Sequence, residues 1–141
     1  MNNRTLNYTT LVIPAVASPV FLYYIITNYT MDMYRIIGLV IVIPSFLLLI
    51  IARIQLGGSF SLRAQADQLV TSGLYSKIRH PIYFFGLIYI SGWAFCLKTF
   101  YIILLAVLVL IMQIRRSRKE EKVLEEKFGK AYTDYKQTTW F

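Results

Sequence analysis

The sequence contains one cysteine, Cys96, and one histidine, His80, among its 141 residues. A disulfide needs two cysteines, and a structural zinc site needs four ligands drawn mainly from cysteine and histidine. Neither a disulfide framework nor such a zinc site can therefore form within this chain, and we expect no metal. Cys96 lies inside an apolar segment, where we interpret it as a small buried residue.

Acidic side chains are also scarce, with 7 Asp and Glu against 15 Lys and Arg, which gives a net charge of +8. The basic residues flank apolar segments instead of forming a continuous polar surface. We therefore expect membrane lipids, and no nucleic acid, as the partner of these charges. No apolar segment contains Asp or Glu, which disfavours the alternative of a small four-span transporter, because proton coupling needs a carboxylate within the membrane.

Apolar residues make up 57% of the chain. They gather in four segments, at about residues 11–26, 34–52, 81–97 and 100–114. Segments of this length and composition are typical of membrane helices. We predict an all-α, integral membrane protein that forms a single domain, residues 1–141, with four transmembrane helices. Residues 115–141 are predicted to form a C-terminal amphipathic helix on the cytoplasmic membrane surface, which Gly129 would weaken or break.

Lys and Arg are distributed unequally between the two ends of these segments. The N-terminus, the loop at residues 53–80 and the chain after Ile114 hold all but two of them, and the two short links hold only Arg35 and Lys98. Cytoplasmic segments of membrane proteins carry the excess of basic residues. Both termini and the loop between the second and third helices are therefore predicted to be cytoplasmic.

The stretch at residues 69–83 carries the single histidine and ends at the start of the third apolar segment. A tight turn joins the third and fourth segments, so the fourth returns the chain to the side from which the third departed. We therefore expect His80 to lie near Arg116, Glu120 and Glu121, in a site that suits a ligand with both charges. Taken singly, each glutamate is better explained as the partner of a nearby lysine on a solvated helix.

Two blocks of the sequence carry a more specific signal. The first comprises residues 69–75 and 79–83, and the second comprises Glu120, Glu121, Leu124, Phe128, Gly129, Tyr132 and Tyr135. Together they resemble the isoprenylcysteine carboxyl methyltransferase family and its phospholipid methyltransferase relatives, over about residues 53–136. The resemblance implies transfer of a methyl group from S-adenosyl-L-methionine to a lipophilic acceptor that enters from the bilayer.

The same resemblance assigns site residues by position. It implies cofactor contacts from Gln68, Leu69, Val70, Tyr75, His80, Pro81, Ile82, Tyr83, Glu120 and Glu121. It also implies that Arg116 faces the methyl acceptor and acts with Glu120 in catalysis. Two other enzyme classes stay open. A phospholipid amine N-methyltransferase would also have four spans, and a nicotinamide-dependent membrane reductase is an alternative because some sterol reductases contain a similar His-Pro block.

Overall fold

A computed structural model describes residues 3–56 and 69–140, apart from the side chains of residues 3–14 and 100. Every regular element in these ranges is helical, which confirms the all-α prediction. The elements are α1 (Asn3–Asn28), α2 (Met33–Leu56), the short 3-10 helix η2 (Gly73–Ser76), α3 (Pro81–Leu97), α4 (Phe100–Phe128) and α5 (Lys130–Thr138).

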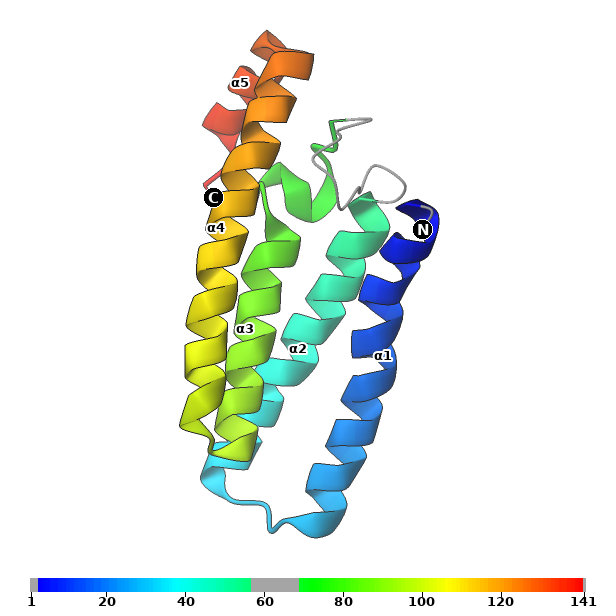
Figure 1. Ribbon diagram of the computed structural model, residues 1–141, viewed down its shortest axis with the longest axis vertical. Coiled ribbons are helices and arrows are strands. Elements are labelled where there is room, and N and C mark those ends of the chain that lie inside the picture. The colour runs from blue at the N-terminus through cyan, green and yellow to red at the C-terminus, as the bar shows by residue number, and fades with distance from the viewer. Residues whose placement is uncertain (1–2, 57–68, 141) are drawn as a thin grey trace.

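Helices α1 to α4 run up and down beside one another (Figure 1). The links at residues 29–32 and 98–99 lie at one end of this bundle, which we call the link end. The start of α1, the end of α2, η2, the start of α3 and α5 lie at the other end, which we call the η2 end. The chain segments predicted to share one side of the membrane are therefore at one end of the bundle.

Helices α2 and α3 approach each other closely because glycines face one another across their contact. A Cβ atom built on Gly38 of α2 would lie 2.7 Å from the backbone nitrogen of Cys96 and 2.8 Å from the carbonyl oxygen of Gly92, both on α3. A Cβ atom on Gly92 would lie 2.7 Å from a methyl group of Val42. Small residues at a helix contact let backbones pack directly against each other, as is common between membrane helices.

Helix α1 packs against the middle of the bundle through few side chains. The hydroxyl groups of Ser18 and Tyr89 are 2.6 Å apart, and the ring of Phe21 meets Trp93 edge-on at 5.5 Å between centroids. Ile25 is fully buried against Val42 and the α3 side chains around it. These residues of α1 thus complete the core, while Val16, Val20 and Tyr23 on the same helix are exposed.

The third predicted segment, residues 81–97, coincides with α3, and Pro81 occupies its first turn, where the missing N–H costs no hydrogen bond. The prediction that α4 ends near residue 114 and that a separate helix begins at Arg115 is wrong, because α4 continues to Phe128. No glycine or proline interrupts residues 100–128, and the charged residues there are good helix formers. The predicted break at Gly129 is confirmed: its φ of 51° ends α4.

Among the described residues, α2 is the single helix long and apolar enough to cross a membrane by itself. The apolar stretches Ala15–Asn28 and Pro81–Leu97 are shorter, so the four-span topology stays a prediction. Exposed apolar side chains occur on several helices, including Val40 at 67%, Tyr101 at 77% and Met112 at 63% exposure. Soluble monomers rarely expose large apolar areas, so these surfaces suit contact with lipid.

The link end is held together by Asp32. Its carboxylate accepts a hydrogen bond from the backbone N–H of Arg35 at 3.0 Å, which caps the start of α2. It also pairs with the guanidinium of Arg35 at 3.1 Å and with the ammonium of Lys98. These bonds lower the pKa of Asp32, the bond with Lys98 contributing most. One carboxylate therefore ties the α1–α2 link to the α3–α4 turn.

Candidate functional site

The start of α3, the polar half of α4 and helix α5 lie together at the η2 end of the bundle (Figure 1). Charged and aromatic side chains of these segments contact one another there. Helix α3 begins there, and α4 extends beyond its start, so the polar half of α4 lies beside the first turn of α3. Helix α5 then reverses direction after Gly129 and packs back along α4. The result is a compact set of ionisable groups drawn from sequence positions about 40 to 60 residues apart.

Glu120 is the first of two carboxylates in this set. It accepts a hydrogen bond of 2.5 Å from the hydroxyl of Tyr83 on α3 and one of 2.9 Å from Nε of Arg116, one turn earlier on α4. The Arg116 guanidinium also lies over the Tyr83 ring, 5.9 Å from its centroid. Glu120 thus joins α3 to α4 and has its charge partly balanced by Arg116.

Glu121, the second carboxylate, points to different partners. Its oxygens lie 3.4 Å from Nε2 of His80, 3.7 Å from Nε of Arg79 and 3.1 Å from Nζ of Lys136 on α5. Burial raises the pKa of Glu121, but the hydrogen bond with Lys136 and the nearby cations outweigh burial, so its pKa is lowered. Glu121 is therefore ionised at neutral pH.

His80 lies between the two carboxylates and is nearly buried, with 10% of its side chain exposed. Its ring stacks on Tyr83 at 5.6 Å between centroids, while Nδ1 faces Glu120 at 3.9 Å and Nε2 faces Glu121 at 3.4 Å. Burial lowers the pKa of His80 more than the carboxylates raise it. The imidazole is therefore neutral at pH 7 and donates a single N–H.

The η2 segment forms the side of the site that leads into α3. Gly73 adopts a φ of 63°, a conformation favourable for glycine, and the next N–H, that of Leu74, donates to Oε1 of Gln55 at 2.8 Å. Tyr75 is thereby turned inward and is 6% exposed. Its burial raises the pKa of its phenol, and the charge of Glu120 acts in the same direction. The Tyr75 hydroxyl therefore stays protonated, and Tyr75 lies close enough to Glu120 for the two groups to interact electrostatically.

Helix α5 closes over this segment. The hydroxyl of Tyr135 donates a buried hydrogen bond of 2.5 Å to the carbonyl oxygen of Tyr75. The backbone N–H of Trp140 donates to the carbonyl oxygen of Lys77 at 3.0 Å. A guanidinium N–H of Arg79 approaches the carbonyl oxygen of Lys136 at 3.5 Å. Helix α5 and the residues that follow it are therefore bonded to the η2–α3 segment at three positions.

We expect Tyr135→Phe to lower the free energy of unfolding by about 1–3 kcal/mol, because it leaves the buried Tyr75 carbonyl without its donor. Thermal unfolding of the purified protein in detergent measures this. Tyr101→Phe is the matched control, since Tyr101 is 77% exposed and its loss of a hydroxyl should leave the unfolding midpoint unchanged. Equal midpoints for the two variants would contradict a stabilising role for α5.

The structure brings five of the predicted site residues into mutual contact: His80, Tyr83, Arg116, Glu120 and Glu121. Tyr75 and Pro81 are buried at the same end, and Leu69, Val70 and Ile82 are half-buried there. Gln68 lies outside the described residues. The resemblance favours Glu120 as the cofactor-binding glutamate, with Glu121 a close second, and the structure gives the two carboxylates different hydrogen-bond partners.

Three further residues of the site were not predicted as such: Arg79, Lys136 and Tyr132. Arg79 precedes His80 and looked like one more basic residue at a helix start. Lys136 follows Tyr132 by one helical turn, so both lie on the face of α5 that meets the rest of the site. The helical spacing of Tyr132 and Tyr135 indicated that one face of this helix is buried. It did not indicate that this face meets Glu121, because that contact depends on the reversal of the chain at Gly129.

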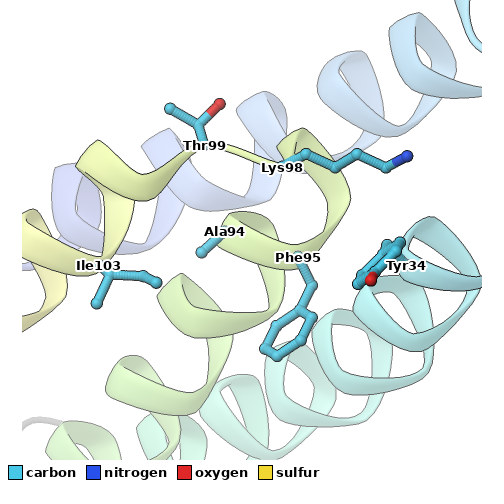
Figure 2. Close-up of a pocket in the computed structure, with 6 residues that line it drawn as sticks. All are labelled: Tyr34, Ala94, Phe95, Lys98, Thr99 and Ile103. Atoms are coloured by element: carbon cyan, nitrogen blue, oxygen red, sulfur yellow. The ribbon is translucent and has the colours of Figure 1, made fainter.

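A pocket of about 320 Å³ lies at the link end, away from these charges. Figure 2 shows its six lining residues, which come from the start of α2, the end of α3, the α3–α4 turn and the start of α4: Tyr34, Ala94, Phe95, Lys98, Thr99 and Ile103. Its walls are mostly apolar, and the ammonium of Lys98 is paired with Asp32. This pocket offers no pair of acid and base groups, so we place the candidate chemistry at the η2 end.

Comparison with known proteins gives one family. A model of the family described as phospholipid methyltransferase matches residues 29–131. The match begins at the link after α1 and ends at the start of α5, so it contains both carboxylates and the whole η2–α3 segment. No curated protein gives a significant match.

Proposed function

The chain belongs to the phospholipid methyltransferase family, and from that membership we propose that it is an integral membrane enzyme that uses S-adenosylmethionine to methylate a lipophilic acceptor at the cytoplasmic face. The observation that carries the proposal is the Glu120 carboxylate, which accepts hydrogen bonds from Tyr83 and Arg116 beside the His80–Glu121 contact. This arrangement joins the two sequence blocks that resemble membrane methyltransferases.

The residues present suit a ligand of this kind. S-adenosylmethionine supplies, when bound, an electrophilic methyl group on a positively charged sulfur, and it also carries an ammonium and a carboxylate. Glu121 already holds an ammonium, that of Lys136, at 3.1 Å, which shows that this carboxylate can serve an ammonium group. Tyr83 and Tyr75 present aromatic rings, which attract cations through their faces.

The surroundings of the site suit a reaction that excludes water. Tyr75, Tyr132 and Tyr135 are all less than 10% exposed, and α5, which carries Tyr132 and Tyr135, packs over Tyr75 at the polar end. Below the site the bundle presents apolar side chains on its outside, such as Leu108 and Ile111 of α4. A lipophilic acceptor could therefore reach the site along the helices. Holding both reactants in line in a dry site is what accelerates methyl transfer most.

Arg116 is the residue we propose to orient the acceptor. Its Nε is bonded to Glu120, and its guanidinium lies against Tyr83, so the group is anchored between α3 and α4. A guanidinium binds carboxylates in a planar, two-pronged geometry. An acceptor carboxylate would use its own lone pair to form the new bond to the methyl carbon as the carbon–sulfur bond breaks, and no proton would need to leave.

A phospholipid amine is the second candidate acceptor, and the description of the matching family favours it. An amine must lose a proton to be methylated, and the new bond again forms as the carbon–sulfur bond breaks. The carboxylates Glu120 and Glu121 could bind the cationic headgroup before that proton leaves. The two products differ chemically, because a methyl ester releases methanol in alkali and a methylated amine does not.

The test is calorimetric titration of the detergent-purified protein with S-adenosylhomocysteine, and in parallel with a nicotinamide dinucleotide. We expect binding of S-adenosylhomocysteine alone. Incubation with methyl-labelled S-adenosylmethionine and either a prenylated cysteine or a phospholipid amine should then label one acceptor, and alkali treatment identifies the bond. Binding of the dinucleotide alone would assign the protein to the membrane reductases and contradict the proposal.

A further inference from the structure

Two buried hydrogen-bond donors beside Glu121 find no acceptor among the described residues. They are Nε of Arg79 and the hydroxyl of Tyr132. Tyr132 is only 1% exposed, so water does not reach its side chain freely. Folded proteins rarely leave buried donors without an acceptor, because the lost hydrogen bonds to water are not replaced. The pair therefore marks a place where an anionic or carbonyl group would be stabilised.

Both donors belong to the same corner of the site. Nε of Arg79 is 3.7 Å from Oε1 of Glu121, and another guanidinium nitrogen approaches the carbonyl oxygen of Lys136 at 3.5 Å. Tyr132 precedes Lys136 by one turn on α5, so their side chains share a face. Burial raises the pKa of Tyr132, Glu121 raises it further, and Arg79 opposes them. The phenol is therefore a protonated donor within electrostatic range of both charges.

The other groups expected to bind an anion are already occupied or unsuited. His80 is neutral and directs both ring nitrogens toward carboxylates, at 3.9 Å from Glu120 and 3.4 Å from Glu121. It therefore offers an incoming anion no positive charge to offset these carboxylates, whereas the guanidinium of Arg79 does. Pro81 begins α3 and has no backbone N–H to offer. An anionic group is therefore better placed on the Arg79 side of Glu121 than on the His80 side.

An α-amino acid carries its ammonium and its carboxylate on one carbon atom. A site that binds both groups needs an anion and a cation as close neighbours, and Glu121 and Arg79 meet that condition. We infer that Arg79 and Tyr132 bind the carboxylate of the amino-acid end of the methyl donor, with its ammonium at Glu121. The inference rests on the proposed function and adds to it two residues that position the donor, one from the segment between η2 and α3 and one from α5.

The test compares two ligands that differ in one group: S-adenosylhomocysteine and its decarboxylated analogue, which keeps the amine. Calorimetry is done in detergent without added phospholipid, so that no lipid phosphate supplies the anion. Tyr132→Phe should weaken binding of S-adenosylhomocysteine about tenfold or more, the effect of one hydrogen bond to a charged group, and leave the analogue unaffected. Arg79→Lys should also weaken binding of S-adenosylhomocysteine.

Two controls separate this role from a structural one. Tyr132→Phe removes a hydroxyl that has no partner in the ligand-free fold, so its unfolding midpoint should not fall. Tyr135→Phe removes a bond within the fold, so any loss of affinity should be equal for the two ligands. If Tyr132→Phe leaves S-adenosylhomocysteine unaffected or weakens both ligands equally, the inference is wrong. If the unmodified protein binds neither ligand, the proposed function itself fails.

Discussion

Replacement of Glu120 by glutamine is expected to reduce methyl transfer and S-adenosylhomocysteine affinity by about 10²–10³-fold, the largest effect of any single polar substitution in the site. The amide removes the charge that balances Arg116. Tyr83 and Arg116 both donate to Oε1 of Glu120, so the new NH2 group either faces these two donors or takes the Oε2 position beside Nδ1 of His80. Removing one partner from a largely buried ion pair costs about 3–5 kcal/mol because the remaining charge stays desolvated. Glu120 is 21% exposed, so the lower part of that range applies.

The matched control is Glu126→Gln on the same helix. Glu126 is exposed and lies beyond the contacts that Glu120 makes, so this change removes an equal charge from α4 without touching the site. Turnover and affinity should stay within about twofold of the unmodified protein, as for most exposed substitutions. If Glu120→Gln kept full affinity while its helical content was unchanged, Glu120 would be a structural link between α3 and α4 and not a ligand residue.

The second large effect is expected at Gly38, where valine should destabilise the bundle by about 3 kcal/mol or more. The new side chain would overlap backbone atoms of α3 at 2.7 and 2.8 Å, and backbone atoms can withdraw only if the helices separate. Overpacking of cores usually costs 1–3 kcal/mol, and the rigid neighbours place this site at the upper limit. Thermal unfolding in detergent, followed by circular dichroism, measures the change.

Gly86→Ala on α3 serves as the control for glycine replacement itself. The nearest atoms to a Cβ at this position lie 3.7 and 4.0 Å away, which is ordinary contact. Alanine also favours a helix by about 1 kcal/mol relative to glycine. We expect Gly86→Ala to unfold at or above the midpoint of the unmodified protein. A Gly38→Val protein as stable as this control would show that the α2–α3 contact is not tight in solution.

Local rules predicted the parts of the fold that local chemistry determines. The start of α3 at Pro81 and the break at Gly129 each follow from the backbone preferences of one residue. The length of α4 was predicted wrongly because the change from apolar to charged side chains at Arg115 was read as the end of a helix. Hydropathy reports what surrounds a helix, whereas continuity depends on backbone conformation, and nothing at Arg115 alters that conformation.

The contacts of the site also divide into those that could be predicted from the sequence and those that could not. The meeting of His80 with Glu120 and Glu121 was predictable because a short turn between two antiparallel helices fixes which residues become neighbours. The contacts of α5 were not predictable. Lys136 reaches Glu121 only because the chain reverses at Gly129 by a particular angle. Glycine adopts many combinations of φ and ψ, so its presence at position 129 does not determine that angle.

Helix α4 is one continuous helix, so its apolar half is rigidly connected to the carboxylates of the site. Its 29 residues extend for about 44 Å, against about 30 Å for the hydrocarbon core of a bilayer. Because no hinge separates its apolar half from Glu120 and Glu121, any tilt of that half must swing both carboxylates relative to Tyr83 and His80. If the helices span the bilayer as proposed, membrane thickness would set this tilt. The positions of the two carboxylates would then depend on bilayer thickness, and the rate of methyl transfer would vary with acyl-chain length.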